Sequence, residues 1–252
     1  MNKLQYVLAV CTLVIFCILW TTYETPFIQA FDRGASDLLY GNKFITLFHY
    51  LGETKFIFAV TIIIWIIIWI RKKDYRLMVF VIFSVGGGYG LYQLLKRVIE
   101  RPRPDIVDQF STFSFPSGHA VHGLLYLFTI AYVFNLFCTS KSASLIVWIT
   151  AIILTLFIGV SRITEARHFA SDVIAGWLLG YSWSMWIISI LTDIWVLFLF
   201  YNIAVYCMRG KRNNVMFVVG ILALFVLTIY LTDYHTGWFW LKNPSVAITC
   251  IH

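Results

Sequence analysis

Long apolar segments without charge are the feature that most restricts what this chain can fold into. The segments from Phe56 to Ile70 and from Ala143 to Val160 contain no charged side chain. In the hydrocarbon core of a bilayer, backbone polar groups must be satisfied within the spanning structure, which only helices and closed barrels achieve. Continuous apolar segments of this length are typical of membrane-spanning helices. The sequence therefore predicts an all-α, polytopic membrane protein.

Composition agrees with a membrane protein and excludes several other classes. The 252 residues are 60% hydrophobic and only 12% charged, whereas soluble domains have about 25% charged residues. The net charge of +7 does not indicate nucleic-acid binding, because no soluble basic segment carries it; positive loops of membrane proteins record topology and contact anionic headgroups. We expect a membrane lipid and the bilayer as partners, and no nucleic acid, and leave the oligomeric state open. The five scattered cysteines predict neither a disulfide framework nor a metal site.

Apolar segments and their polar boundaries predict a six-helix core. The stretch from Pro26 to Lys55 mixes aromatic, apolar and charged residues, which is typical of a helix lying in the membrane interface. Two further hydrophobic helices are predicted over 194–208 and 215–231, so that residues 1–190 form the catalytic core and 191–252 an extension of unknown role. The predicted spans of the core are Leu4–Trp20, Phe56–Ile70, Leu77–Leu95, His119–Phe137, Ala143–Val160 and Val173–Ile190.

Glycines of the third span, Gly86-Gly87-Gly88-Tyr89-Gly90, have no preceding strand and lack the Lys-Ser/Thr of a phosphate-binding loop. Gly86 and Gly90 instead have the spacing that lets membrane helices approach closely. We therefore predict that this pair packs against a neighbouring helix.

Charged loops predict the orientation of the core. The segment from Arg71 to Arg76 carries four positive charges and is predicted to be cytoplasmic. Alternation of the spans then places the loop from Lys96 to Gly118 and the stretch from Ser161 to Asp172 together on the opposite side. Positive charges in that loop oppose the usual topological preference, which favours a binding role for them.

Three polar stretches would meet on that side. The first runs from Lys96 to Pro104, and the second is Pro116-Ser117-Gly118-His119, which leads directly into a helix. Free backbone N–H groups at a helix start, beside a glycine, form an anion site. The third stretch contains Arg162, a forked donor suited to phosphate, and His168. Asp172 lies four residues after His168, so on a helix the two would share one face, and the carboxylate would keep one imidazole nitrogen protonated.

Each stretch also has a purely structural interpretation. Lys96 and Arg97 can be snorkelling ends of the third helix, which is the favoured interpretation for Arg97. Pro116-Ser117 can be an ordinary helix start, and His122 is either a group that supports the site or helix lining. A single histidine at a helix mouth is more often an interfacial polar residue than a nucleophile. Convergence of the three stretches is what favours a functional interpretation.

The three stretches resemble the signature of the type 2 phosphatidic acid phosphatase (PAP2) superfamily, in its membrane lipid phosphatase branch. Lys96 to Arg103-Pro104 is similar to its Lys-x6-Arg-Pro motif, and Pro116 to His119 to its Pro-Ser-Gly-His motif. The residues from Ser161 to Asp172 resemble its Ser-Arg-x5-His-x3-Asp motif. Arg101-Pro102 has the wrong spacing from Lys96, so the resemblance gives Arg101 no role.

The resemblance implies a metal-independent phosphohydrolase that needs no cofactor and works through a phosphohistidine. His168 would attack phosphorus, Asp172 would fix its tautomer, and His119 would protonate the leaving oxygen and later activate water. The groups expected to hold the phosphate oxygens are Lys96, Arg103, Ser117, Gly118 and Arg162.

The same resemblance implies a lipid substrate: phosphatidylglycerol phosphate, phosphatidic acid or undecaprenyl diphosphate, the last of which would place the protein in cell wall biogenesis. Two alternatives stay open. A phosphohistidine could pass its phosphoryl group to an acceptor other than water, as in a lipid phosphotransferase, or the chain could be a lipid-phosphate binder or flippase without turnover. We expect a bacterial cytoplasmic membrane with the site on its extracytoplasmic side.

Overall fold

The computed structural model describes residues 3–71, 73–106 and 109–192. Their contacts divide into a unit formed by residues 8–185 and a second unit formed by residues 1–7 and 186–252. Described residues of the second unit form the first turn of the first helix and the last turns of the last described helix. The helices predicted over 194–208 and 215–231 lie outside the described residues. The extension predicted over 191–252 lies outside them as well, apart from its first two residues.

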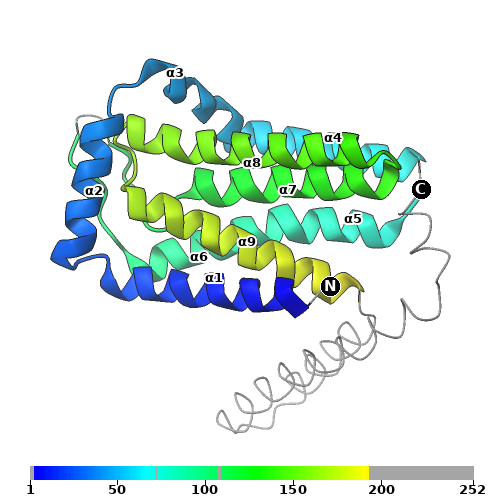
Figure 1. The fold of residues 1–252 in the computed structure, drawn as a ribbon, viewed down its shortest axis with the longest axis horizontal. Helices are drawn as coiled ribbons and strands as arrows, with labels where there is room; N and C mark the ends of the chain where they lie inside the picture. Colours follow the sequence, from blue (N-terminus) through cyan, green and yellow to red (C-terminus); the bar gives the residue numbers. More distant parts are fainter. Residues whose placement is uncertain (1–2, 72, 107–108, 193–252) are drawn as a thin grey trace, which may run out of the picture. The chain divides into compact units, whose positions relative to one another are not determined.

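All regular structure in the described residues is helical, which confirms the predicted all-α class (Figure 1). The observed helices match the first, second and fourth predicted spans closely, because charged or polar residues end each of these apolar segments. The third span combines α5, a π-helical segment and α6 without a break, and α9 covers the predicted sixth span as one helix. The elements are α1 (Lys3–Thr22), α2 (Pro26–Leu39), α3 (Lys43–Thr46), η1 (Leu47–Gly52), α4 (Thr54–Arg71), α5 (Tyr75–Val81), η2 (Ile82–Gly87), α6 (Gly88–Ile99), α7 (Gly118–Phe137), α8 (Lys141–Thr164) and α9 (Ala170–Thr192).

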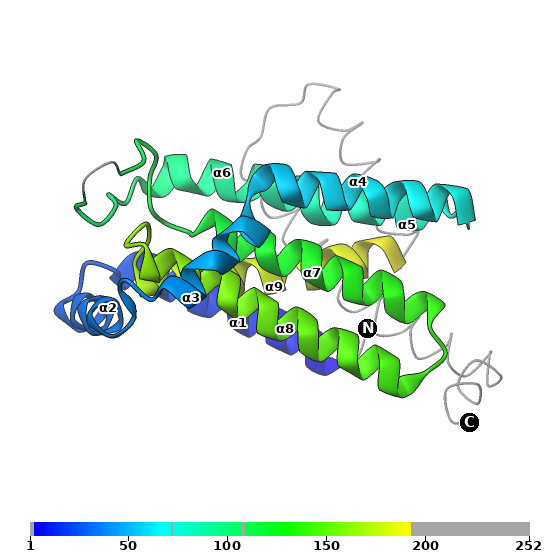
Figure 2. The same cartoon turned by 90° about the horizontal axis from the view of Figure 1, so that it is seen from above.

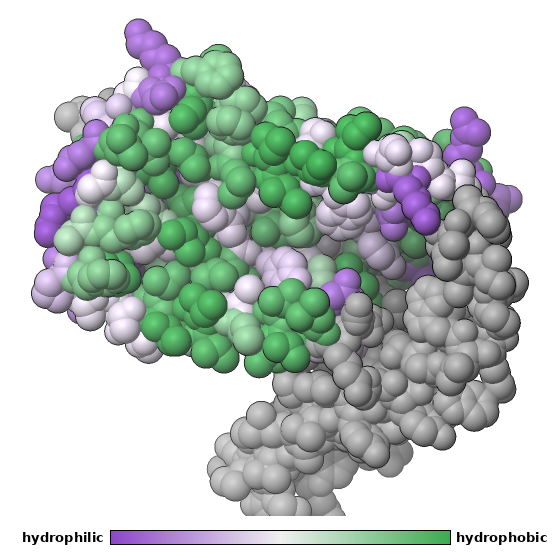
Figure 3. Space-filling view, viewed as in Figure 1, coloured by the Kyte–Doolittle hydropathy of each residue, from purple (hydrophilic) through white to green (hydrophobic). Residues whose placement is uncertain are grey.

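Hydropathy on the surface agrees with a bilayer environment. Within the described residues, five helical segments are long and apolar enough to span a membrane: α1, α4, α5 to α6, α7 and α8. Their outward side chains are largely apolar, and Ile63 of α4 and Ile146 of α8 are 56% and 63% exposed. Figure 3 shows this apolar surface along the flanks of the helices, with hydrophilic residues gathered toward their ends. In a bilayer these apolar side chains would contact lipid instead of water, so they need not be buried inside the protein.

The interfacial helix predicted after the first span is shorter than expected and crosses one end of the bundle. It is α2, which begins at Pro26, a residue favoured in the first helical turn because its missing N–H has no intrahelical partner. Figures 1 and 2 show α2 running across the ends of the long helices. Phe27 and Leu38 on α2 are about four-fifths exposed, whereas Asp32 is buried. A charged residue thus points from α2 into the protein.

The prediction that Gly86 and Gly90 of the third span pack against a neighbouring helix is wrong. A Cβ on Gly86 or Gly90 would meet no described atom within 4 Å, whereas Gly87 lies against Trp183 and Gly88 against Leu125 and Trp183. The π-helical segment from Ile82 to Gly87 changes which side chains share a face, and the four-residue spacing rule assumes an uninterrupted α-helix. The close approach therefore belongs to the central glycines of the run.

Helices α7 and α9 approach each other closely at Gly176. A Cβ there would lie 2.7 Å from the Cβ of Ala120 and 2.8 Å from the carbonyl oxygen of Ser117. Both neighbours belong to the first turn of α7, whose backbone cannot move without moving the residues beside it. Gly176 therefore sets the distance between two helix starts at the polar end of the bundle.

We predict that Gly176→Ala destabilises the protein by about 1–3 kcal/mol, because overpacking forces backbone shifts. Thermal unfolding of the purified protein in detergent measures the effect. Gly90→Ala is the matched control and should leave the unfolding temperature unchanged or slightly raised, since its Cβ meets open space and alanine favours a helix. Equal unfolding temperatures for the two variants would contradict this role of Gly176.

Candidate active site

His168 lies in the turn that joins α8 to α9. Helix α8 continues through Ser161 and Arg162 to Thr164, and α9 begins only at Ala170. The prediction that His168 and Asp172 share a helical face is therefore wrong, because His168 precedes the helix. The backbone N–H groups of Arg167 and His168 both donate to the carbonyl oxygen of Arg162, at 3.0 and 3.2 Å. This tight turn still brings Nδ1 of His168 to 3.6 Å from Oδ2 of Asp172.

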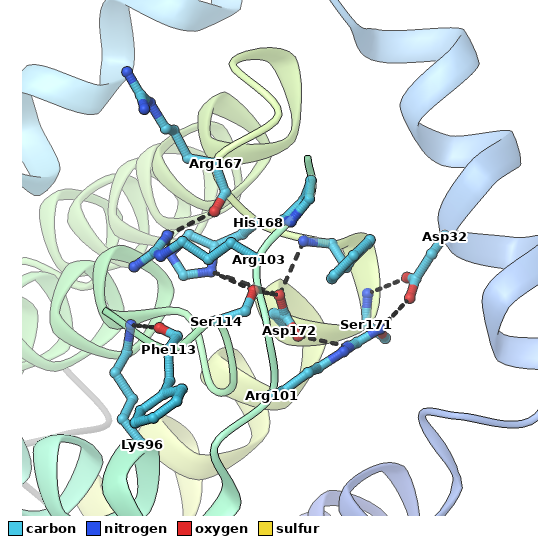
Figure 4. Close-up of polar contacts among 12 residues, drawn as sticks. Asp32, Lys96, Arg101, Arg103, Phe113, Ser114, Arg167, His168, Ser171 and Asp172 are labelled. Carbon is cyan, nitrogen blue, oxygen red and sulfur yellow. Dashed lines mark hydrogen bonds and ion pairs between the residues drawn. The ribbon is translucent and has the colours of Figure 1, made fainter. Parts of the chain in front are cut away.

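One contact with an arginine and one with a serine distinguish the two ring nitrogens of His168. Nε2 lies 3.1 Å from Nη1 of Arg103, and a guanidinium can only donate, so Nε2 carries the lone pair. Nδ1 then carries the proton and faces the hydroxyl of Ser114, 3.4 Å away, with Asp172 behind it. Figure 4 shows Arg103 and Asp172 on opposite sides of the ring. The geometry presents a nucleophilic nitrogen beside a cation.

The carboxylate of Asp172 is fully buried and held from several sides. Oδ1 accepts a hydrogen bond of 2.6 Å from Arg101, and Oδ2 accepts from the hydroxyl of Ser114 and, at 2.9 Å, from the backbone N–H of Phe169. A charged donor at one oxygen and neutral donors at the other compensate the burial of this carboxylate and restrict its rotation. Asp172 is therefore a fixed negative charge behind His168.

Cations from three segments of the chain act on His168, and one of them, Arg103, contacts its lone-pair nitrogen. Lys96 at the end of α6 is buried, and its Nζ donates to the carbonyl oxygen of Phe113 at 2.9 Å, leaving two further N–H donors. Arg103 is anchored by Thr112 and by the carbonyl oxygen of Arg167, at 2.7 and 2.6 Å. Arg162 donates to Glu165 at 2.6 Å, and its buried Nε makes no hydrogen bond with the described residues.

The start of α7 differs from its prediction in one respect. The N–H of Ser117 donates to the carbonyl oxygen of Asp172 at 3.0 Å, so this amide is not free to bind an anion. The hydroxyl of Ser117 is buried without a hydrogen bond to any described residue, and Gly118 begins the helix beside it. The donors left for an anion at this position are thus the Ser117 hydroxyl, which the sequence did not predict, and the amides that follow it.

His119 projects from the first turn of α7 toward the start of α4. Its buried Nε2 makes no hydrogen bond with the described residues and lies 3.6 Å from Oε1 of Glu53. A Cβ on Gly52 would lie 2.5 Å from Cδ2 of His119, so only glycine leaves room for the imidazole. His122, one turn later, is buried among Phe58, Tyr89 and Tyr92, which agrees with helix lining.

Sequence reasoning missed several residues of this cluster. Arg101 was set aside because of its spacing, although its guanidinium contacts Asp172 directly. Asp32 and Ser114 were not considered, because isolated polar residues outside the motifs give no signal along the chain. One available signal was the pair of Arg-Pro dipeptides: residues before proline favour extended backbone, in which side chains two apart point to the same side.

Comparisons with known proteins agree with this geometry. A model of the PAP2 superfamily matches residues 77–196. Phosphatidylglycerophosphatase B from Bacillus subtilis (strain 168) is 31% identical over 176 residues, which cover 66% of this chain and 85% of the relative. The chain belongs to the PAP2 superfamily.

A solved structure extends the likeness to the whole fold. The crystal structure of a transmembrane PAP2-type phosphatidylglycerolphosphate phosphatase from Bacillus subtilis superposes with a TM-score of 0.67 at 25% identity. The alignment covers 74% of this chain and 96% of that one. The protein is a multi-pass membrane phosphatase of the PAP2 superfamily.

Electrostatics of the PAP2 site favour a neutral His168. Burial lowers the pKa of His168 well below its ordinary value of about 6.5, and the positive charges of Lys96, Arg103 and Arg162 lower it further, against a backbone hydrogen bond at Ser114 that raises it. Burial and the charge of Arg162 lower the pKa of Arg103 to about 10, so Arg103 remains charged at neutral pH. A neutral base among cations suits attack on an anionic group.

We expect these charges to appear in the pH profile of kcat/KM, which reports the free enzyme. A histidine with a lowered pKa stays neutral until the pH falls below that value, so loss of activity through protonation of His168 should begin well below pH 6.5. Arg103→Gln removes one positive charge and should move this acidic limb to higher pH. An unchanged limb in the variant would contradict the electrostatic account.

We also predict that Gly52→Ala lowers kcat by about 100-fold, because displacing a reacting group by about 1 Å has an effect of this size. The alanine methyl would overlap the ring of His119 and Cγ2 of Ile158, which lies 2.7 Å from the added Cβ. Phosphate release by the purified variant measures the loss. Gly34→Ala, whose Cβ meets no described atom within 4 Å, is the control and should keep parental activity.

Proposed function

We propose that this protein hydrolyses membrane lipids that end in a phosphate monoester, with phosphatidylglycerol phosphate as the first candidate, through a phosphohistidine at His168. One observation carries the proposal: Nε2 of His168 lies beside Nη1 of Arg103 while Asp172 stands behind Nδ1. An anionic phosphoryl group that binds to Arg103 is thereby placed against a nitrogen lone pair. The relatives named as phosphatidylglycerophosphatases support this choice of lipid.

In the proposed first step, Nε2 of His168 attacks phosphorus and the bond to the leaving lipid oxygen breaks. Lys96, Arg103, Arg162 and the start of α7 hold the other three oxygens, where negative charge gathers in the transition state. The imidazole becomes positively charged as the P–N bond forms, and Asp172 stabilises that charge. His119 gives its proton to the departing oxygen.

In the second step, a water molecule replaces the lipid and attacks the phosphohistidine. His119, now neutral, takes the proton of that water, the P–N bond breaks, and inorganic phosphate leaves. His168 returns to its neutral state with the lone pair on Nε2. Proton and charge therefore balance over the two steps without any further reactant.

The orientation of the site in the membrane belongs to this proposal. Glu53 lies beside His119 and directly precedes α4, whose 18 residues extend about 27 Å. Arg71 at the far end of α4 begins the positively charged loop predicted to be cytoplasmic. We therefore propose that the site faces the extracytoplasmic side, at the depth of lipid headgroups.

Phosphate release by the purified protein in detergent tests the function. We expect release from phosphatidylglycerol phosphate, less from phosphatidic acid and undecaprenyl diphosphate, and a loss on the order of 10⁴-fold or more in His168→Ala. Activity should survive EDTA, because the described residues offer no group of three or more His, Cys, Asp or Glu side chains placed to hold a metal ion. Labelled substrate should leave acid-labile phosphate on the parent protein but not on the variant.

The competing functions give different results in the same experiment. Transfer of the labelled phosphoryl group to an added alcohol or lipid, with little free phosphate, would favour a phosphotransferase. Binding of the lipid without release or transfer by the parent would overturn the hydrolase and favour a binder or flippase. Thermal unfolding of His168→Ala, matched to the parent, shows that the variant is folded.

A further inference from the structure

Arg101 is as deeply placed in the polar cluster as the residues of the three motifs. Its side chain is 5% exposed, and its guanidinium joins two buried carboxylates. Nη1 donates to Oδ1 of Asp172 at 2.6 Å and to the hydroxyl of Ser171 at 2.8 Å, while Nη2 donates to Oδ2 of Asp32 at 2.8 Å. Figure 4 shows Arg101 between the two aspartates.

Aromatic rings hold the plane of this guanidinium. Its carbon lies 4.7 Å from the ring centre of Tyr23 and 4.3 Å from that of Phe169. Tyr23 follows the end of α1 and Phe169 directly precedes α9, so two separate segments of the chain fix the ring contacts. Cation–π contacts add to the hydrogen bonds and restrict movement of Arg101.

Asp32 completes the arrangement from α2. Oδ1 of Asp32 accepts from the backbone N–H of Ser171 at 2.8 Å, and Oδ2 accepts from the Ser171 hydroxyl at 2.7 Å. The N–H of Ser171 is one of the donors that the first turn of α9 leaves without an intrahelical partner. Asp32 therefore holds both the start of α9 and the second arm of Arg101.

The two oxygens of Asp172 are held separately, and among the described residues Arg101 is the donor to Oδ1. Ser114 and the Phe169 N–H fix Oδ2, the oxygen nearest His168. Without the bond to Oδ1, the carboxylate could turn about the bonds at Oδ2, and a buried anion would lose its counter-charge. The direction that Asp172 presents to His168 thus depends on Arg101.

Binding of phosphate by Arg101 is the main alternative, and the hydrogen bonds argue against it. Both of its terminal nitrogens already donate to carboxylates or to Ser171, on the far side of Asp172 from Arg103. Arg103, by contrast, contacts the imidazole nitrogen that carries the lone pair. The two Arg-Pro arginines thus separate into one that faces the phosphate and one that faces the carboxylate.

We propose that Arg101 and Asp32 are positioning residues for His168: Arg101 fixes the carboxylate of Asp172 against the imidazole, and Asp32 fixes Arg101. This inference rests on the proposed attack by His168. It makes α2, a helix outside the three motifs, part of the apparatus that orients the nucleophile.

Kinetics of Asp32→Asn, Arg101→Gln and the double variant test the proposal. We expect kcat to fall about 10-fold in Asp32→Asn and about 100-fold in Arg101→Gln, because outer residues that orient a reacting group contribute about 10–100-fold. KM and the inhibition constant of inorganic phosphate should stay within about twofold of the parent, since Lys96, Arg103 and Arg162 are unchanged. Arg103→Gln should raise both constants.

Coupling separates positioning from unrelated losses. If Asp32 acts through Arg101, the double variant should have the kcat of Arg101→Gln alone. A double variant whose loss of kcat equals the product of the two single losses would overturn the claim that Asp32 acts through Arg101. A raised inhibition constant of phosphate in Arg101→Gln would instead show that Arg101 binds phosphate. Exposed Asp37 on α2 and exposed Arg97 supply matched controls. Asp37→Asn and Arg97→Gln should retain parental kcat, and unfolding temperatures identify any variant that has lost its fold.

Nuclear magnetic resonance gives a measurement that needs no turnover. Within the described part of the chain, the titratable and charged groups near His168 are Lys96 on α6, Arg103, His119 on α7, Arg162 on α8 and Asp172 on α9, with Arg101 and Asp32 behind Asp172. In Arg101→Gln the charge of Asp172 is no longer balanced, so the imidazole of His168, assigned by comparison with His168→Asn, should titrate at higher pH than in the parent. An unchanged titration would overturn the inference even in a protein that releases no phosphate, whereas absence of phosphate release alone would overturn only the proposed function.

Discussion

The buried carboxylate of Asp172 is the group around which the polar end of the protein is organised. A charge removed from water is costly unless hydrogen bonds and an opposite charge compensate it. Compensation here comes from Arg101, Ser114 and the backbone of Phe169, which belong to segments far apart in the sequence. The backbone carbonyl of Asp172 accepts a hydrogen bond from the Ser117 N–H and so fixes the start of α7.

The same requirement explains why α2 lies across the end of the bundle. Arg101 satisfies Asp172 but, as a buried cation, gains a second partner in Asp32 on α2. Asp32 in turn satisfies the first turn of α9. One buried charge is thus connected, through successive pairings, to α2, which also packs Ala35 and Leu39 against the apolar core.

Cations on the other side of His168 are arranged differently. A positive charge on His168 is opposed by Lys96, Arg103 and Arg162. Glu165 forms a salt bridge with Arg162. A bound phosphate would relieve this repulsion and accept the remaining donors, including the Nε of Arg162, which has no hydrogen bond within the described part of the chain. In the proposed mechanism, the anions behind His168 and the cations in front of it would give phosphoryl transfer its direction.

The sequence by itself determined the membrane class, the positions of the spans and the three polar stretches. Apolar segments of this length have few other stable solutions, and charged residues end them clearly. It could not decide which glycines pack, because a π-helical segment changes the periodicity on which the prediction relied. Nor could it show that His168 precedes its helix, since the residues of the turn are compatible with helix.

Only the tertiary structure decided that Arg101 pairs with both Asp32 and Asp172. Motif spacing measures distance along the chain, whereas compensation of a buried charge depends on which side chains meet in space. Asp32 is 140 residues from Asp172 in the sequence, and no local pattern links them. Their connection through one guanidinium exists because burial of Asp172 requires a counter-charge, and the folded chain provides Arg101 at that place.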